Sequence, residues 1–363
     1  MNITIIGAGP VGNYTGHLLA KSGHNVDIYE EHSQIGNPIQ CTGLLTSDFD
    51  QFKFKMDSFL VNTFDTIKVF SPNEELDVKR KEYLVCRTKF DQFFGNLAKK
   101  SGAKIHLSHS FIRKEGKDLI IKDLKQNIEK KISPDIVIGA DGPLSKVAKA
   151  YGFYERSRKN FFGIQAVVEG NFSKGEFKTY FGKDVCPDLF VWVVPESKNT
   201  ARVGLANTKD TKKLFDNFVK KHNFKILLMQ AGTIPIYNPK QKVEFENCYL
   251  VGDAATQVKA TTLGGLIPGF NSAQILVESI NKQKSYKKAL LPVRRRLFLH
   301  LILHKILIKL SDEDWDFLVK LIRQKRIQKV LETFSRDNPI PLVFCALLLE
   351  PRFIYFAKYL RFF

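Results

Sequence analysis

The residues with the clearest chemical potential are three glycines near the start of the chain. Gly7, Gly9 and Gly12 follow the spacing Gly-x-Gly-x-x-Gly, directly after an apolar run at residues 2–6. In this pattern the first glycine permits a tight turn, the second lets a pyrophosphate approach the backbone, and the third lets a helix pack closely. The N–H groups and dipole at the start of that helix then face an anion. The spacing therefore predicts a site for the pyrophosphate of a dinucleotide.

The segments around these glycines are those that a dinucleotide site requires. Residues 13–21 have helical spacing, and residues 25–29 predict a second strand that ends at Glu30. An acidic residue roughly 20 positions after the glycines accepts hydrogen bonds from an adenosine ribose. Strand, helix and acidic residue together favour dinucleotide binding over a glycine turn in an unrelated α/β protein.

Two later segments repeat the arrangement of a buried strand that ends in a turn of glycine and aspartate. Asp141 follows the apolar run at residues 135–138, and Asp253 follows the run at residues 247–251. We assign both turns to the same dinucleotide-binding domain as the first. Arg87 directly precedes residues 88–101, whose spacing predicts an amphipathic helix.

By pattern, the chain divides into three parts. Residues 1–160 and 247–282 contain the strands and helices of the dinucleotide-binding domain. Residues 161–246 carry strand-like runs at hairpin spacing and predict an antiparallel-sheet substrate domain. Residues 283–363 are helical by periodicity. No low-complexity linker separates the parts, so we expect the two lobes to be interleaved.

The three turns in this order resemble those of the glutathione-reductase-like flavoproteins of the hydroxylase type. Three further stretches resemble the geranylgeranyl reductase family, and most closely its archaeal ether-lipid branch, the digeranylgeranylglycerophospholipid reductases. Residues 38–43 are similar to the family's PxxC segment, residues 251–265 to its GDAAGQVKPTTGGG segment, and residues 190–195 to its YxWxFP motif. The similarity runs through ordered motifs from residue 1 to about residue 279.

The resemblance implies a fold, a cofactor and an activity. The fold class would be α/β with an α+β insert: a glutathione-reductase-like FAD-binding Rossmann lobe, an antiparallel-sheet substrate lobe and a helical C-terminal cap. The cofactor would be FAD. The enzyme would be an FAD-dependent oxidoreductase acting on CH–CH bonds, reducing geranylgeranyl double bonds in membrane ether-lipid precursors. Hydride would pass from reduced flavin N5 to one alkene carbon, with a proton delivered to the other.

The resemblance also assigns roles to individual residues. Cys41 is expected beside the isoalloxazine as the catalytic-site residue, and Phe190 and Trp192 are expected to face the prenyl substrate. In the family, the aspartate that matches Asp253 holds the ribityl or pyrophosphate part, and the following helix directs its dipole at the flavin. The residues expected to bind FAD are Gly7, Gly9, Val11, Gly12, Glu30, Cys41, Thr42, Arg87, Asp141, Asp253, Gly264, Gly265 and Leu266.

The sequence departs from the family motifs at several positions. Thr256, Ala260 and Leu263 stand where the motif has Gly, Pro and Gly, and Leu263 adds bulk where the backbone would approach the flavin. Phe190 lacks the hydroxyl of the usual Tyr, and Val194 is smaller than the usual Phe. These departures affect the choice of substrate or chain length more than the choice of cofactor.

The formal net charge of +19 predicts an anionic partner, either a membrane surface with acidic lipids or a polyanion. A basic host proteome is the alternative reading. No RNA-binding signature or basic tail is present, which argues against nucleic acid. The apolar stretch 297–303 after three arginines and the aromatic tail 353–363 suit either a helix in a membrane interface or a core helix with snorkelling ends.

The five cysteines are scattered and include no CxxC pair, which fits a reducing cytosol and neither disulfides nor a zinc site. His300 and His304 have a spacing that could hold a metal, but with no acidic or Cys partner nearby we expect a solvated or interfacial helix face and no metal.

The apolar run 342–349 is far shorter than the roughly 20 residues of a membrane-spanning helix. The expected location is the cytoplasm, peripherally on the inner face of the cell membrane.

Two other functions remain open at this point. An FAD-dependent monooxygenase of a hydrophobic small molecule would have the same fold but would consume oxygen with NAD(P)H, and the PxxC segment argues against it. A non-catalytic membrane-associated flavoprotein is the other class, for which Leu263 is the only hint. The chain has no second GxGxxG for NAD(P)H, so the external electron donor is open as well.

Overall fold

The central strand of the first sheet is β1 (Asn2–Ile6), whose four last residues are buried. The computed structural model describes residues 1–154 and 158–360. Both faces of β1 are covered, which is why its sequence is apolar without alternation. The sheet has the order β16-β17-β10-β1-β2-β6 and is parallel except for β16. Its other strands are β2 (Asn25–Glu30), β6 (Lys104–Leu107), β10 (Ile136–Gly139), β16 (Glu244–Phe245) and β17 (Cys248–Leu250).

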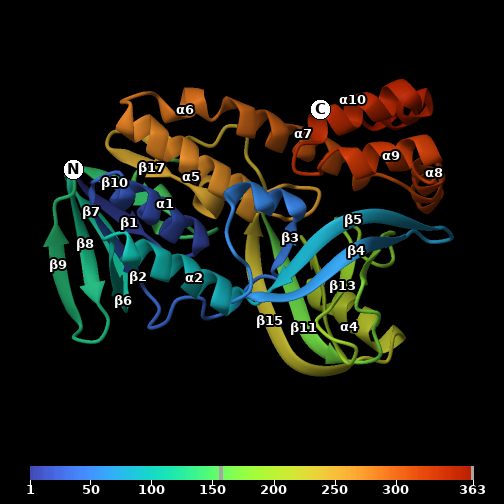
Figure 1. The fold of residues 1–363 in the computed structure, drawn as a ribbon, viewed down its shortest axis with the longest axis horizontal. Coiled ribbons are helices and arrows are strands. Elements are labelled where there is room, and N and C mark those ends of the chain that lie inside the picture. The colour runs from blue at the N-terminus through green and yellow to red at the C-terminus, as the bar shows by residue number, and fades with distance from the viewer. Residues whose placement is uncertain (155–157, 361–363) are drawn as a thin grey trace.

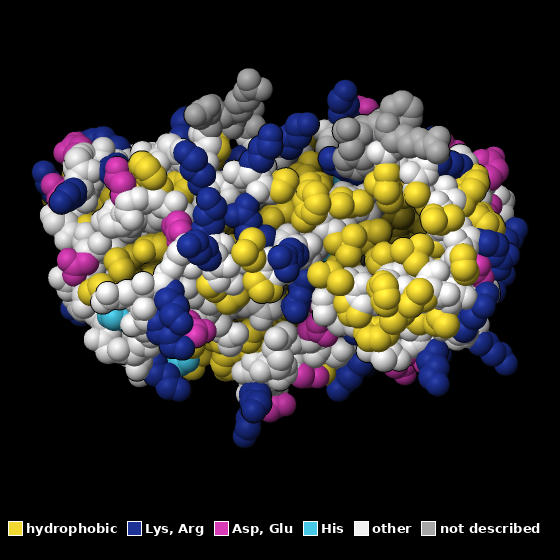
Figure 2. Space-filling model, turned by 90° about the horizontal axis from the view of Figure 1, so that it is seen from above, with side chains coloured by type: hydrophobic (Ala, Val, Ile, Leu, Met, Phe, Trp, Pro, Cys, Tyr) yellow, Lys and Arg dark blue, Asp and Glu magenta, His cyan; other side chains and the backbone are white. Residues whose placement is uncertain are grey.

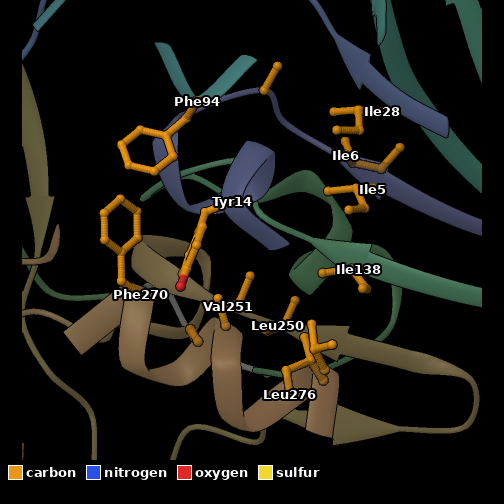
Figure 3. Close-up of a cluster of buried hydrophobic side chains, with 14 of the residues drawn as sticks. Ile5, Ile6, Tyr14, Ile28, Phe94, Ile138, Leu250, Val251, Phe270 and Leu276 are labelled. Atoms are coloured by element: carbon orange, nitrogen blue, oxygen red, sulfur yellow. The ribbon is translucent and has the colours of Figure 1, made fainter. Parts of the chain in front are cut away.

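Three helices join this sheet in one hydrophobic core: α1 (Pro10–Lys21), α2 (Arg87–Lys100) and α5 (Leu266–Asn281). Figure 3 shows side chains from the sheet and from these helices meeting in that core. The ring of Phe270 on α5 lies 4.9 Å from Tyr14 on α1 and 4.9 Å from Phe94 on α2, measured between centroids. Aromatic packing of this kind fixes the helices relative to one another, and thereby the N-termini of α1 and α5.

The second sheet has eight strands in the order β15-β11-β14-β13-β12-β4-β5-β3. Figure 1 shows it beside the first sheet, at the opposite end of the molecule from the N-terminus. The parallel pairing of β4 with β12 joins an early part of the chain to the later strands. The strands are β3 (Leu44–Thr46), β4 (Leu60–Phe70), β5 (Glu75–Val85), β11 (Asn160–Glu169), β12 (Glu176–Tyr180), β13 (Val191–Pro195), β14 (Thr200–Asn207) and β15 (Lys225–Pro235).

This sheet differs from the expectation in two ways. Strands β3, β4 and β5 lie within residues 1–160, the range expected for the dinucleotide-binding domain, yet they pair in the second sheet. Strand β15 was not anticipated at all. Its residues 225–229 are exposed on both faces, so they lack the alternation by which a half-buried strand is recognised.

The smaller elements of the first half follow the sequence pattern. Residues 109–132 form the expected meander, although its first strand begins earlier than predicted. These elements are η1 (Ser47–Phe52), β7 (His109–Glu115), β8 (Asp118–Asp123), β9 (Ile128–Ile132), α3 (Lys146–Ala150), α4 (Thr211–Lys221) and η2 (Gly252–Ala255).

The C-terminal region forms a helical layer in which residues 286–301 pack on the core of the first sheet and the later helices lie over the second sheet (Figure 1). A capping box starts α8: Ser311 accepts a hydrogen bond from the Asp314 N–H, and Asp314 accepts one from the Ser311 N–H. Of the expected aromatic tail, residues 361–363 lie outside the described residues. The helices of this layer are α6 (Tyr286–Ala289), α7 (Leu291–Leu307), α8 (Asp312–Ile322), α9 (Lys325–Thr333), α10 (Pro339–Leu349) and η3 (Pro351–Leu360).

In residues 1–154 and 158–360, no individual helix has both the length and the apolar character to span a bilayer. The pair α10 and η3, bent by 119°, passes that test as a unit by length and composition.

Candidate functional site

The three glycines at the start of α1 have distinct surroundings. Gly7 has φ +103°, and a Cβ there would overlap the carbonyl of Ala140, while a Cβ on Gly12 would overlap the carbonyl of Gly7. A Cβ on Gly9 would meet nothing within 4 Å, and Gly9 is the N-cap of α1. The space beside Gly9 is therefore open in front of the helix N-terminus, as a bound pyrophosphate requires.

Glu30 lies at the edge of the same turn. Its Oε2 accepts a hydrogen bond of 2.8 Å from the Ala8 N–H, and its Oε1 lies 3.0 Å from the His32 backbone nitrogen. The end of β2 thus places a carboxylate against the glycine turn. This is the position from which an acidic side chain reaches the ribose of a dinucleotide.

The turn around Asp253 packs directly on α1. The side chain of Val11 fills the space that a Cβ on Gly252 or Gly269 would occupy. A Cβ on Gly265 would lie 2.8 Å from Asp253 Oδ1, so the glycine at the start of α5 makes room for this carboxylate. The glycine turn, η2 and the N-terminus of α5 therefore converge on one place, as the sequence predicts.

Asp253 supplies the carboxylate at the place where the glycine turn, η2 and the N-terminus of α5 meet. Burial raises the pKa of Asp253 to about 6, while Arg87 and Arg158 act to lower it. Arg158 also donates a hydrogen bond of 2.6 Å to the Ala254 carbonyl. A carboxylate held at the N-terminus of a helix between two cations can accept hydrogen bonds from the hydroxyls of a ligand.

The third turn uses its aspartate differently. Asp141 Oδ1 accepts a hydrogen bond of 2.5 Å from the Ser145 hydroxyl, and Oδ2 accepts one of 3.0 Å from the Val147 N–H. Burial raises the pKa of Asp141 above its usual value, against the effect of these hydrogen bonds. Both oxygens thus serve the start of α3, and direct contact of Asp141 with a cofactor stays a prediction.

Cys41 lies in a loop beside a fixed cation. Its Sγ lies 3.4 Å from the Gly43 nitrogen, and its thiol interacts with the Arg87 guanidinium. Arg87 in turn donates two hydrogen bonds of 3.1 Å to Asp91 on the next turn of α2. Burial acts to lower the pKa of Arg87, but Asp91 and Cys41 raise it above its ordinary value, so the guanidinium stays charged.

A row of cross-strand neighbours holds this loop against the second sheet. Gln230, Gln165, Gly204 and Trp192 occupy paired positions on β15, β11, β14 and β13. Because a Cβ on Gly204 would lie 2.6 Å from the Trp192 indole, only glycine lets the indole cross β14. Trp192 Nε1 then donates a hydrogen bond of 3.1 Å to Gln165 Oε1, which also accepts one of 2.6 Å from the Thr42 hydroxyl.

The structure places Arg202, which the sequence did not predict as a site residue, beside the Cys41 loop. Its Nη1 donates to the carbonyls of Thr42 and Val85, and its Nε lies 2.7 Å from Glu196 Oε1. The side chain is only 11% exposed. The sequence did contain a signal for this contact: Arg202 and Gln165 are polar residues on the mostly apolar strands β14 and β11. A buried polar residue needs a hydrogen-bond partner, so both residues could have been expected to bind a neighbouring segment.

The predicted substrate residues begin an aromatic row that leads toward the C-terminal helices. Ring centroids are 6.1 Å apart for Trp192 and Phe190, 5.2 Å for Phe190 and Phe181, and 4.6 Å for Phe181 and Trp315. Trp315 lies on α8, so the row joins β13 to the helical layer. Such a surface suits an apolar chain.

A buried ionic cluster connects the loop before α5 with the segment before α10. Lys259 forms an ion pair with Asp337, and both side chains are 4% exposed. Glu82 is fully buried and lies 2.6 Å from Arg336 Nη2. Burial raises the pKa of Glu82 to about 7, although Arg336 and Lys259 act to lower it. The sequence offered no indication of this cluster, since its members lie far apart in the chain.

The expectation of a solvated face for the two histidines of α7 was wrong. His300 and His304 are 3% and 7% exposed, because this face of α7 packs against the body of the protein. The His300 ring bonds Thr261 at 2.7 Å and the His304 ring bonds the Asp188 carbonyl at 2.9 Å. Burial lowers the pKa of His300 to about 3. Within the described part of the chain, no group of three His, Cys, Asp or Glu side chains could hold a metal ion.

Two of the departures from the family motif have left-handed backbone. Thr256 has φ +56° and Leu263 has φ +58°, and both stand where the motif has glycine. A left-handed conformation costs a non-glycine residue roughly 1–2 kcal/mol. Leu263 packs against the core of the second sheet, which offsets part of this cost.

The chain resembles known proteins in sequence and in fold. Residues 5–55 match the family described as "NAD(P)-binding Rossmann-like domain". A digeranylgeranylglycerophospholipid reductase of Methanocaldococcus jannaschii is 28% identical over 88% of this chain and 90% of its own length. One of Methanosarcina acetivorans is 25% identical over 91% of this chain and 90% of its own length.

Solved structures confirm the expected α/β fold class. A geranylgeranyl bacteriochlorophyll reductase-like protein of Thermoplasma acidophilum has a TM-score of 0.83 at 21% identity, covering 98% of each chain. The p-nitrophenol 4-monooxygenase PnpA of Pseudomonas putida has a TM-score of 0.72 at 14% identity, covering 95% of this chain and 98% of its own. At these identities the structural likeness shows the fold alone.

Proposed function

We propose that this chain, which is similar to geranylgeranyl reductases in sequence and in fold, uses FAD to reduce geranylgeranyl double bonds in membrane ether-lipid precursors. The observation that carries this proposal is the similarity to digeranylgeranylglycerophospholipid reductases over about nine-tenths of both chains. The sequence motifs behind the similarity also meet in space. The glycine turn and Asp253 lie at one convergence, and Arg87 connects it with the Cys41 loop.

The residues present fit FAD. The open space beside Gly9 suits the pyrophosphate, Glu30 lies where a ribose hydroxyl would donate, and Asp253 lies at the N-terminus of α5. When bound and reduced by an external donor, FAD would supply the hydride for one alkene carbon, and a proton would be delivered to the other. The dipole of α5, together with Arg87, would stabilise negative charge on a ring placed at this convergence.

The remaining residues position the substrate and exclude water. Thr42, Gln165 and Trp192 are joined by hydrogen bonds, so the loop of Cys41 and the aromatic row keep a fixed distance. Phe190 and Trp192 supply an apolar surface for the prenyl chain, and such a surface removes water from the reacting carbons. Fixed geometry of this kind lowers the entropic cost of bringing an alkene to the reacting centre.

The proposed place of action is the inner face of the cell membrane, with electrons from an external donor. The net charge of +19 supports an anionic surface as partner. A lipid substrate with long prenyl chains is insoluble in water, so the enzyme must meet it at a membrane or in a carrier.

An anaerobic single turnover tests the proposal. The purified flavoprotein would be reduced with dithionite and mixed with a digeranylgeranyl phospholipid in detergent micelles, and the lipid would be analysed by mass spectrometry. We expect a gain of hydrogen pairs that falls strongly in Cys41→Ala and is retained in Cys345→Ala, a matched cysteine on α10.

An unchanged lipid together with fully bound flavin would refute the proposal. In that case, oxygen consumption with NAD(P)H and a hydrophobic phenol would indicate a monooxygenase. The absence of both activities would indicate a flavoprotein without catalysis.

A further inference from the structure

The helix α10 is apolar on every side and yet lies on the surface. Its eleven residues contain no charged side chain, and Pro339 alone among them is buried. Phe344 is 62% exposed and Leu348 is 65% exposed. A helix that is hydrophobic all round belongs in a protein core or in a membrane. Because α10 is not in the core, we propose that α10 and η3 form a membrane-docking hairpin that enters the acyl region of an anionic bilayer.

The apolar surface extends beyond α10. Ile354 on η3 is 71% exposed, and Phe298 and Leu291 on α7 are 47% and 48% exposed. Figure 2 looks down on the side of the molecule that the C-terminal helices cover. Hydrophobic side chains gather over one half of that side, with Lys and Arg side chains around the margin of the patch. An exposed apolar patch of this kind marks a site of interaction with a protein or a membrane.

The charges of the hairpin favour an anionic membrane. Between residues 339 and 360, all of them described, Glu350 is the single acidic residue, and the basic residues are Arg352 and Lys358. The Glu350 side chain is 2% exposed and lies 2.7 Å from both Arg326 and Arg352. The hairpin therefore presents no exposed carboxylate to a lipid headgroup, while basic and tyrosine side chains on η3 lie where headgroups would be met.

The dimensions suit entry into one leaflet. A helix of eleven residues is about 16 Å long, close to the roughly 15 Å of hydrocarbon in half a bilayer. The bend of 119° between α10 and η3 turns the chain back before it would reach the second leaflet. Neither element spans a membrane by itself, so the hairpin docks to one surface.

The docking surface overlaps one of the two stretches for which the sequence left a membrane interface or a core helix open, because the described part of the aromatic tail lies in η3. For the other stretch, α7, the structure favours the core helix: Leu297 and Leu301 are buried, and Arg294 donates to the Pro239 carbonyl at 2.5 Å. Most of α7 is thus a packed helix of the protein body. Only its outward side chains join the patch that α10 dominates.

The hairpin also adjoins the aromatic row of the site. Trp315 and Phe356 belong to one buried cluster, against which Phe181 and Phe353 pack. A lipid whose headgroup lies at the membrane surface would therefore find an apolar route from η3 past Trp315 toward Trp192. This part of the inference rests on the proposed function, whereas membrane docking itself does not.

Vesicle co-sedimentation tests the inference with the full-length flavoprotein. Wild type, Phe344→Asp/Leu348→Asp and the matched control Leu227→Asp/Leu228→Asp would be mixed with phosphatidylglycerol vesicles and with phosphatidylcholine vesicles. The control residues are 51% and 55% exposed and lie on β15, away from the hairpin. Bound flavin and circular dichroism would establish that each variant is folded.

We expect the α10 variant to bind phosphatidylglycerol vesicles more than about tenfold more weakly, because each lost apolar contact is worth about a tenfold change in partitioning. The control should bind like wild type. Wild-type binding should be weaker on phosphatidylcholine and at high salt. Phe344→Trp should show fluorescence that is quenched by brominated acyl chains, which reports insertion directly.

Three results would overturn the inference. The first is vesicle binding by the α10 variant equal to that of wild type. The second is loss of binding only in the β15 variant, which would place docking on that strand. The third is a wild-type dimer that binds no vesicles and becomes monomeric in the α10 variant, which would assign the face to a second copy. Turnover of lipid in detergent micelles is independent of all three, so failure here and failure of the proposed function are distinguishable.

Discussion

Replacing Lys259 by methionine should destabilise the protein strongly, because it leaves a buried carboxylate without its partner. Lys259 and Asp337 are each 4% exposed, and Asp337 also accepts a hydrogen bond of 2.6 Å from Thr46. Burial acts to raise the pKa of Asp337, but Lys259 lowers it below its usual value, so the carboxylate is charged in the folded protein. Methionine keeps the apolar stem and removes only the ammonium group.

The expected magnitude follows from the burial of the pair. Removing one partner of a buried ion pair costs about 3–5 kcal/mol. For a chain of 363 residues the unfolding entropy near the melting temperature is about 0.76 kcal/mol/K, so Tm should fall by about 4–7 °C. The double variant Lys259→Met/Asp337→Asn should recover much of this loss, since it leaves no uncompensated charge.

Differential scanning fluorimetry at pH 7 would measure all three proteins. The exposed pair Lys282 and Glu278, at 2.7 Å at the C-terminal end of α5, gives the control, and Lys282→Met should leave Tm almost unchanged. A Lys259→Met protein as stable as wild type, or a double variant no more stable than the single one, would refute the reasoning about the buried charge.

Three further variants test other parts of the structure. Gly9→Val should fold normally and lose bound flavin, because the valine side chain enters the open space at the N-terminus of α1. Gly12→Val should fail to fold, because its side chain would overlap the Gly7 carbonyl. Flavin retained in Gly9→Val would contradict this. Gly204→Ala should displace the Trp192 indole and change tryptophan fluorescence and substrate KM, and an unchanged spectrum would speak against the cross-strand row. Glu82, with a pKa of about 7 in the folded state, contributes stability below its ordinary pKa of 4.5 that is lost as pH rises toward 7. Melting curves against pH should show this loss in wild type and not in Glu82→Gln, and parallel curves would disprove it.

The sequence predicted the parts of the site that depend on local spacing. Gly7, Gly9 and Gly12 each need a distinct backbone environment, and that requirement is visible in the spacing alone. The same holds for Gly252 and Asp253 after β17, because a strand, a turn and a helix in this order leave few alternatives.

The parts that the sequence did not reveal depend on pairing between distant segments. Strand β15 has no hydrophobic alternation, and its place beside β11 follows only from the finished sheet. Gln165 and Arg202 were missed because a polar residue on a strand does not disclose its partner. His300 was misjudged for the same reason, since its burial depends on helix packing rather than on its own segment.

The most direct test of the central claim is to compare electrons lost by the flavin with hydrogen gained by the lipid. The reduced protein would be mixed anaerobically with a digeranylgeranyl phospholipid in micelles, while flavin absorbance and lipid mass are followed in the same sample. We expect the oxidised flavin spectrum to return, with one hydrogen pair added to the lipid for each flavin reoxidised. Flavin that stays reduced while the lipid mass does not change would contradict reduction of geranylgeranyl chains by this protein.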